Sequence, residues 1–291
     1  MVINWRDTSR TIDCVTRLCA DDAVDEVLVV DNESSKRTRE ALEAINQGRL
    51  SVIPVAENRG YAAGVNVALD ALRQREVAPR NVLLVNNDLV AEGGAVAALI
   101  DHLDESPSCG IVGPIIYHYP SGQLDSIQSA GGVLRPWRGT VSQRTSAAGF
   151  SDVGYVTFAC ALLRYDAIIS VGAFDEKYFM YWEDVDLCQR VRNVGWSLDI
   201  EPRARAWHEL SASSERAGSL LLTYGTWAAC TFASSYGLPW PATVRVRAVL
   251  SAARRLVKGR RGEARALLRG LSMPRDPRRP AYIVRADLVE A

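Results

Sequence analysis

Two stretches decide the fold: EVLVVDN at residues 26–32 and NVLLVNND at residues 81–88. Each is a short, continuous apolar run that ends in polar side chains. Such runs are typical of parallel strands that are buried on both faces of a sheet. The sequence therefore predicts an α/β architecture in which helices cover both faces of a mostly parallel sheet.

Helical and extended patterns alternate on either side of these two runs. Further strands are expected at residues 1–4, 51–55 and 153–163, and in a segment that ends at His208. Helices are expected at residues 9–20, 36–47, 62–74, 94–105 and 183–194. Residues 117–152 are punctuated by glycines, which indicates hairpins and a mobile loop. Ligands of doubly wound sheets bind beyond the carboxyl ends of the strands, where we expect Asp31, Asn32, Asn87 and Asp88.

The composition is that of an ordinary folded protein, with 291 residues, 48% of them hydrophobic and 23% charged. It excludes disordered, collagen-like and disulfide-scaffold classes. The formal net charge is zero, but residues 217–291 hold thirteen basic and four acidic side chains, a net +9, which leaves −9 on the first 216 residues. An acidic body with a basic tail indicates two separate functions, or one function carried out at a charged surface.

The six cysteines show no C-x-x-C spacing, and no secretory signal opens the sequence. They are typical of buried, reduced thiols, so we expect a cytoplasmic protein. Residues 217–244 carry no charge, but threonines and glycine interrupt their apolar centre. We therefore do not expect a membrane-spanning helix there.

Residues 86–88, Asn-Asn-Asp, follow a buried strand. Carboxylates at such a strand end can hold a divalent cation that binds phosphate oxygens. The alternative is an ordinary turn, where Asn and Asp are common. Among the three histidines, His102 and His118 are expected to be structural or exposed, whereas His208 can complete a metal site with Asp88.

The block GAFDEKYFMYWEDVDLCQR, residues 172–190, combines five aromatic side chains with five carboxylates. Aromatic walls can raise the pKa of Glu183 and Asp184 toward the range of a general base. The alternative is a helix start, where acidic side chains favour the helix dipole. Asp186 and Arg190, four residues apart, are expected to form a surface ion pair.

Five motifs in this order resemble the family 2 glycosyltransferases, and most of all their bacterial rhamnosyltransferase-like branch. They are VVDN at 29–32, ENRGYAAGVN at 57–66, NND at 86–88, the block at 172–190 and AWH at 206–208. The resemblance covers residues 1–215, and it implies a GT-A fold, a nucleotide-sugar donor, a divalent cation (Mg²⁺ or Mn²⁺) and inversion at the anomeric carbon.

The resemblance also implies residue roles. Asp31, with Asn32 beside it, contacts the base or ribose of the nucleotide. Asp88 and His208 bind the cation, and Asp184 is the general base, with Glu183 beside it. The remaining donor-binding residues that it implies are Asn58, Arg59, Gly60, Asn66 and Asn87.

One departure keeps a second function open. Asn86 stands where the family often has the first acid of its D-x-D motif. The alternative to an enzyme is therefore a catalytically lapsed, GT-A-like protein that binds nucleotide sugars. If the protein is an active enzyme, dTDP-rhamnose is the first expected donor and UDP-hexoses are the next. The acceptor hydroxyl belongs to a glycan, a lipid-linked intermediate or a small molecule. The Gly-rich stretch 131–150, with Trp137, is a candidate acceptor lid.

The family does not account for residues 216–291, which are expected to form a basic helical extension. One interpretation is an amphipathic helix over residues 241–271 that lies on the inner face of an anionic membrane. Its apolar stripe is then Val244, Ala248, Ala252, Leu256 and Val257. The other interpretation is a helical pair that packs on the catalytic domain or forms a homodimer. Nucleic-acid binding is not expected, because no aromatic–basic reading surface accompanies the charge.

Overall fold

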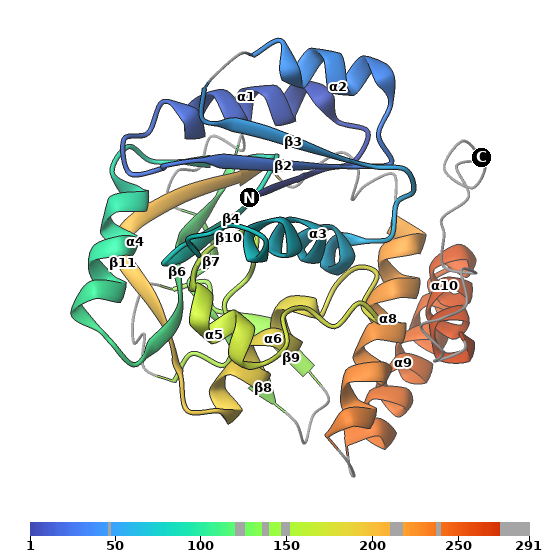
Figure 1. The fold of residues 1–291 in the computed structure, drawn as a ribbon. Coiled ribbons are helices and arrows are strands. Elements are labelled where there is room, and N and C mark those ends of the chain that lie inside the picture. The colour runs from blue at the N-terminus through green and yellow to red at the C-terminus, as the bar shows by residue number, and fades with distance from the viewer. Residues whose placement is uncertain are drawn as a thin grey trace.

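A mixed sheet runs through the centre of the molecule, as the computed structural model shows (Figure 1). The structure describes residues 1–45, 48–119, 126–135, 140–146, 152–209, 218–236 and 240–273. Among these residues, eight strands lie in the order β3-β2-β1-β4-β10-β6-β11-β5, and β7 pairs with β6. The strands are β1 (Val2–Asn4), β2 (Val27–Asn32), β3 (Leu50–Val55), β4 (Asn81–Asn86), β5 (Leu89–Ala91), β6 (Cys109–Tyr119), β7 (Ile127–Ser129), β10 (Cys160–Arg164) and β11 (Ser197–Glu209).

Helices cover both faces of this sheet. They are α1 (Thr8–Cys19), α2 (Lys36–Glu43), α3 (Tyr61–Arg73), α4 (Ala95–Glu105), α5 (Tyr165–Ser170) and α6 (Glu183–Asn193). In Figure 1, α1 and α2 lie above the sheet, and α3, α5 and α6 lie below it. A separate hairpin pairs β8 (Gly132–Arg135) with β9 (Thr140–Gln143). The predicted α/β class is confirmed.

Strand β2 shows why its sequence is a continuous apolar run. All six of its residues are buried. Val27 and Val29 belong to the core that α1 contributes to, whereas Leu28 and Val30 pack with residues of α3 on the other face. A strand covered on both sides needs apolar residues at every position, because successive side chains point to opposite faces.

The chain order creates a switch point in the sheet beside β1. Strand β1 pairs in parallel with both β2 and β4. The chain runs outward from β1 to β3 and then crosses back through α3 to β4 on the other side of β1. In open α/β sheets, ligands bind outside the carboxyl ends of the strands at such a switch point. The residues that follow β1, β2 and β4 are therefore the first place to look for a site.

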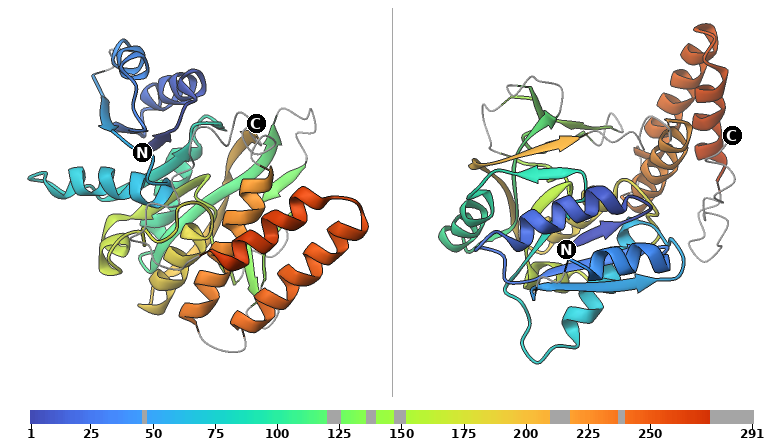
Figure 2. Two further views of the ribbon diagram at one scale, coloured as in Figure 1. Left: turned by 90° about the vertical axis from the view of Figure 1, so that its right-hand side faces the viewer. Right: turned by 90° about the horizontal axis from the view of Figure 1, so that it is seen from above.

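Three further helices follow β11: α8 (Gly218–Ser235), α9 (Trp240–Val257) and α10 (Arg261–Ser272). Helix α8 and the start of α9 continue the main core, because Trp227 and Phe232 of α8 and Trp240 of α9 belong to the same buried cluster as Phe174 and Tyr178. Figure 2 shows α9 and α10 on the outer side of this helical group. Among the described residues, no helix combines the length and the hydropathy needed to cross a bilayer.

Several sequence predictions need correction. The strand expected at 153–163 begins only at Cys160, and it runs antiparallel to β4 and β6. Residues 153–159 gave a strand-like pattern because Val153, Tyr155 and Phe158 are buried, although their backbone forms only an isolated bridge at Tyr155. The helix expected at 36–47 is shorter and ends at Glu43. His118 lies in strand β6 rather than in a loop.

Of the two interpretations of the extension, the single helix over 241–271 is wrong, because the chain forms two helices there, α9 and α10, as the helical-pair interpretation expects. Gly259 lies at the break with a φ of +74°, a left-handed conformation that glycine adopts without steric cost. Trp137 and the beginning of the predicted tail at 216–217 lie outside the described residues.

Candidate active site

Asp88 and His208 meet at the carboxyl ends of β4 and β11. The Asp88 Oδ1 atom lies 3.0 Å from His208 Nε2, and the two side chains are 11% and 14% exposed. The backbone fixes this pair, because the Glu209 N–H donates to the Asp88 carbonyl across 3.0 Å. The structure thus brings together the two residues that were expected to bind a cation.

Gln128 on β7 determines which nitrogen of His208 faces Asp88. Its Oε1 atom lies 3.0 Å from His208 Nδ1. A carbonyl oxygen accepts a hydrogen bond, so this contact favours a proton on Nδ1 and leaves Nε2 facing the Asp88 carboxylate. A proton or a cation between Nε2 and the carboxylate oxygen satisfies both atoms. A metal-binding histidine with its other nitrogen fixed by an oxygen has this arrangement, so the donor set fits a divalent cation.

Asn86 and Asn87 have different surroundings. The Asn86 Nδ2 atom lies 3.5 Å from His208 Nε2, at the edge of the pair. The Asn87 side chain instead donates to Thr11 Oγ1 across 3.0 Å, which turns it toward the start of α1. Asn86 therefore belongs to the Asp88–His208 cluster, whereas Asn87 ties the end of β4 to α1.

Asp31 and Asn32 are buried at the end of β2, with 1% and 2% exposure. One carboxylate oxygen of Asp31 accepts from Asn4 Nδ2 at 2.6 Å, and the other has no partner among the described residues. An unpaired buried carboxylate oxygen costs free energy until a donor reaches it. The N–H and hydroxyl groups of a nucleoside are donors of the required kind.

Asn32 shapes the loop before α3. Its side-chain amide donates to Asn58 Oδ1 at 2.9 Å and to the Gly60 carbonyl at 3.0 Å. The Gly60 N–H in turn donates to Asn58 Oδ1 at 2.9 Å. These bonds fix the predicted donor-binding loop at the switch point of the sheet.

Gly60 brings this loop against the block at residues 172–190. It has a φ of +94°, and a Cβ atom at this position would lie 2.2 Å from the Phe179 carbonyl oxygen. The next residue, Tyr61, donates its N–H to the same carbonyl across 2.9 Å. Only glycine has the conformation and the small volume that this contact requires.

Asn66 and Arg59 extend the same connection. The Asn66 amide donates to the Phe174 carbonyl at 2.9 Å and accepts from the Phe174 N–H at 3.1 Å. Arg59 pairs with Glu176 at 2.7 Å, and Asn66 donates to the other oxygen of that carboxylate. Both residues hold the block in place, so a direct contact between Asn66 and the donor stays a prediction.

Glu183 and Asp184 begin helix α6 after two residues in left-handed conformations. Tyr181 and Trp182 have φ values of +69° and +70°. Each costs about 1–2 kcal/mol relative to right-handed backbone, and residues of this kind gather at functional sites. The turn places both carboxyl groups at the helix start, where Asp184 Oδ1 accepts from the Val185 N–H at 2.8 Å.

Burial raises the pKa of both carboxyl groups. The Asp184 charge raises the pKa of Glu183 further, and one Glu183 oxygen has no partner among the described residues. Burial raises the pKa of the Tyr61 and Tyr155 hydroxyl groups, and the nearby Asp184 charge raises both further. The predicted direction of the pKa shift is therefore confirmed.

Residues 155–159 connect the Asp184 carboxyl group with the end of β4. Tyr155 interacts with Asp184 at one end, and the Ala159 carbonyl accepts from the Asn86 N–H at 2.8 Å at the other. This segment therefore runs from the raised-pKa pair to the end of β4, two residues before Asp88.

Asp186 and Arg190 do not form the expected surface pair. Asp186 is 3% exposed, and it accepts from Arg190 Nε at 2.7 Å and from the Tyr178 hydroxyl at 3.3 Å. Arg190 also donates to the carbonyls of Val171 and Ala173, each at 2.8 Å. The pair fixes the loop that leads into the block, and the helical spacing alone could not reveal its burial.

Two polar groups at the site were not predicted. Gln128 carried no sequence signal, because its role depends on the pairing of β7 with β6. Arg10 at the start of α1 pairs with both Asp7 and Glu209, at 2.9 and 3.0 Å. Since Glu209 follows His208, Arg10 joins the histidine strand to α1.

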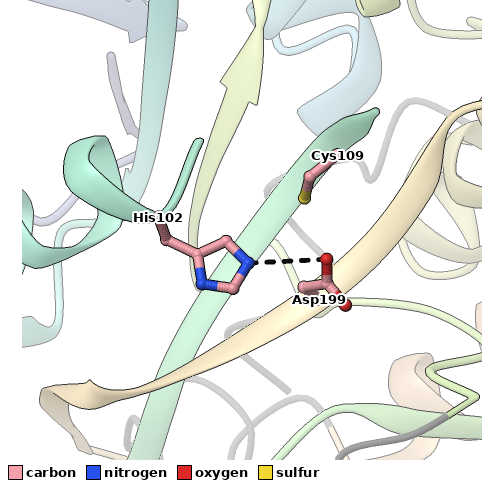
Figure 3. A group of neighbouring side chains, drawn as sticks. All are labelled: His102, Cys109 and Asp199. Carbon is pink, nitrogen blue, oxygen red and sulfur yellow. Dashed lines mark ion pairs between the residues drawn. The ribbon is translucent and has the colours of Figure 1, made fainter. Parts of the chain in front are cut away.

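A second group of metal-ligand side chains lies at the opposite end of the sheet. His102, Cys109 and Asp199 point toward one another from α4, β6 and β11, with ligand atoms within 4.8 Å (Figure 3). Cys109 begins β6, whereas His118, which pairs with His208, lies nine residues along it. At about 3.3 Å per residue the two sites are about 30 Å apart. This group is therefore separate from the Asp88–His208 pair.

Comparison with known proteins places this chain in a family. Residues 5–172 match the model described as "Glycosyl transferase family 2". The chain is 31% identical over 211 residues to an N-acetylglucosaminyl-diphospho-decaprenol L-rhamnosyltransferase of Mycobacterium tuberculosis. This match covers 65% of this chain and 68% of the relative. These matches identify a glycosyltransferase. The chain belongs to glycosyl transferase family 2.

Solved structures support the GT-A fold. A Pyrobaculum calidifontis mannosyltransferase in complex with GDP-Man and Mn²⁺ matches 93% of this chain and 84% of its own, with a TM-score of 0.56 and 13% identity. The structure of GalNAc-T7 with UDP, GalNAc and Mn²⁺ matches 82% of this chain and 51% of its own, with a TM-score of 0.55 and 13% identity.

Proposed function

We propose that this chain is an inverting, metal-dependent glycosyltransferase that moves a sugar from a nucleotide-sugar donor to an acceptor hydroxyl, with Asp184 as the general base. The observation that carries the proposal is the half-buried Asp184 carboxyl group at the start of α6, where desolvation raises the pKa into a range that suits proton transfer near neutral pH. Residues 1–215 form the donor-binding and catalytic part, and residues 216–291 form a basic helical extension.

The reaction follows from the chemistry of the groups present. Asp184 takes the proton of the acceptor hydroxyl while its oxygen attacks the anomeric carbon. The new C–O bond forms on the face opposite the departing nucleotide diphosphate, so one displacement inverts the configuration. Asp31, Asn32 and the 58–60 loop bind the nucleoside end of the donor. Glu183 stays protonated beside Asp184 and limits the negative charge in the pocket.

Asp88 and His208 would hold the divalent cation, and Gln128 orients His208. A bound Mg²⁺ or Mn²⁺ supplies positive charge where negative charge develops on the leaving diphosphate. Asn86 has an amide in place of a carboxylate, so the site has fewer acidic ligands than a D-x-D motif supplies.

The preferred donor is dTDP-rhamnose, with UDP-hexoses as the next choice, because a relative of 31% identity is a rhamnosyltransferase. By the same comparison, the preferred acceptor is a sugar diphosphate linked to a polyprenol. The six buried, free cysteines support a cytoplasmic setting, with such an acceptor reached at the inner face of the membrane.

The general base is tested with Asp184→Asn. We expect transfer to fall by about 10²–10⁴-fold, while donor affinity, measured by calorimetry, stays within about twofold. Asp166→Asn, an exposed carboxylate on α5, is the matched control and should retain activity. A loss of donor binding in Asp184→Asn would assign this residue to the donor site instead.

The catalytically lapsed alternative is tested through the cation site. Wild type and Asp88→Ala are compared for binding and hydrolysis of nucleotide sugars with Mn²⁺ or Mg²⁺. An enzyme loses both metal stimulation and hydrolysis in Asp88→Ala. A lapsed binding protein binds the donor in both forms and hydrolyses or transfers it in neither.

A further inference from the structure

Helix α9 has two apolar faces, and only one of them packs on the protein. Val244, Ala248 and Ala252 are buried, and Ala252 packs with Ala264 and Leu267 of α10. These are three of the residues that the sequence assigned to a membrane-facing stripe. The structure turns these three inward, so the stripe as predicted does not face a membrane; of its five residues only Leu256 and Val257 stay exposed.

The second apolar face points away from these contacts. Val246, Leu250 and Val257 are spaced by four and seven residues, which places them on one side of a helix, and they are 57%, 54% and 89% exposed. Val249 adds to this side and is 49% exposed. We call Val246, Val249, Leu250 and Val257 the outer face of α9.

Basic side chains flank the outer face, and the helix has no acidic residue. Arg247, Arg254 and Lys258 are exposed, and none forms a salt bridge within the described part of the chain. Their long apolar stems can lie beside the valines and leucine while their charges reach outward. An apolar face bordered by unpaired cations matches a surface that is apolar inside and anionic at its boundary.

We propose that the outer face of α9 docks on an anionic lipid bilayer, lying in the interface with Val246, Leu250 and Val257 among the acyl chains and Arg247, Arg254 and Lys258 at the headgroups. Interfacial helices bind in this way, through buried apolar area and attraction to anionic lipid. A second copy of the chain is the less favourable occupant. A twofold contact between two such faces would bring together basic borders that have no acidic residue on α9 to pair with.

This surface is connected to the active site through α8. Phe179 stacks on Tyr224 of α8, with 5.1 Å between ring centroids, and Trp182 contacts Phe232 at the same separation. Trp182 directly precedes Glu183. A bilayer bound at α9 would therefore have a fixed position relative to the proposed catalytic pair. The proposal concerns binding alone and can hold or fail independently of the proposed reaction.

The test is flotation of the full chain with vesicles, without donor or acceptor. Wild type should float with mixed phosphatidylglycerol and phosphatidylcholine vesicles, and far less with phosphatidylcholine alone. The double variant Val246→Asp/Leu250→Asp should bind at least about tenfold more weakly, because two apolar side chains no longer enter the acyl region. Arg254→Gln should weaken binding about fivefold and reduce its salt dependence.

Val77→Asp is the matched control, because Val77 is 80% exposed in the α3–β4 loop, outside α9; it should bind like wild type. Circular dichroism confirms that each variant is folded. Equal binding by wild type and the double variant, or equal binding to neutral and anionic vesicles, would overturn the proposal. The proposal would also be overturned if sedimentation showed that wild type is a dimer and the double variant a monomer, while wild type did not bind vesicles.

Discussion

At the scale of single residues, Asp184 is subject to two opposing effects. The start of α6 favours a negative charge, which is worth about 0.3–1 kcal/mol for an exposed carboxylate and up to about 2 kcal/mol when partly buried. Burial disfavours the charge, and it can raise a carboxyl pKa by about 3–5 units, at 1.36 kcal/mol per unit. The pKa of Asp184 is raised, so burial outweighs the helix dipole at this residue.

This shift predicts the pH dependence of transfer. A general base acts only when it is deprotonated, so activity should rise with pH through the raised pKa of Asp184. The midpoint of this acid limb should lie at least about one pH unit above 3.9, the pKa of a free Asp side chain. The measurement is a profile of kcat against pH with saturating donor.

Two controls separate this limb from other titrations. Glu183→Gln should keep the acid limb, because the pKa of Glu183 is raised further by the Asp184 charge and Glu183 loses its proton later. A limb that disappears in Glu183→Gln would make Glu183 the base. A limb whose midpoint moves with Mn²⁺ concentration would report the cation ligands instead.

Gln128 gives a second prediction at this scale. Gln128→Leu removes the acceptor that holds His208 Nδ1 at 3.0 Å, so His208 loses its fixed ring orientation. We expect the Mn²⁺ concentration for half-maximal activity to rise about 10–100-fold, as for other residues that orient a metal ligand. Activity at saturating Mn²⁺ should largely recover. A kcat loss that excess Mn²⁺ does not reverse would argue against this positioning role.

At the scale of elements, burial determined which strands the sequence could predict. The run at 26–32 is apolar throughout because β2 is covered on both faces. The segment 153–159 is equally apolar, yet it is a buried loop, and periodicity alone does not distinguish the two. The pairing of Asp88 with His208 was open from the residue types alone, and the family resemblance favoured it. Gln128 was missed because its contact spans 80 residues and depends on the register of β7.

The contact between the 58–60 loop and the block at 172–190 gives a prediction for these two elements. Gly60→Ala places a Cβ atom 2.2 Å from the Phe179 carbonyl oxygen, at a φ of +94°. We expect a loss of about 2–4 kcal/mol in the free energy of unfolding, together with weaker donor binding. Urea denaturation and calorimetry measure the two effects.

Gly93→Ala is the control for this substitution, because Gly93 has open space around it. It should change the free energy of unfolding by less than about 0.5 kcal/mol. A Gly60→Ala protein as stable as Gly93→Ala would show that the loop and the block can separate without cost.

At the scale of the whole molecule, the charge division near residue 216 does not coincide with a division of the core. The body and the tail carry −9 and +9, yet Trp227 and Phe232 of α8 pack in the same cluster as Phe174 and Tyr178. The basic charge is concentrated farther out, on α9 and α10 and beyond. Composition located the change in charge, but the three-dimensional contacts decide where one folding unit ends.

Phe232 tests whether the body and the helical extension unfold together. Its ring is fully buried and lies 5.1 Å from the rings of both Trp182 and Trp240, measured between centroids. Phe232→Ala leaves a cavity between α8 and the residue that precedes Glu183, which should cost about 3–5 kcal/mol. Because the core is shared, we expect one calorimetric transition at a lower Tm, and reduced kcat. Val77→Ala, an exposed substitution in the α3–β4 loop, should leave Tm and kcat nearly unchanged. If Phe232→Ala instead shows two transitions, with only the smaller one shifted and full activity retained, residues 216–291 form a separate folding unit.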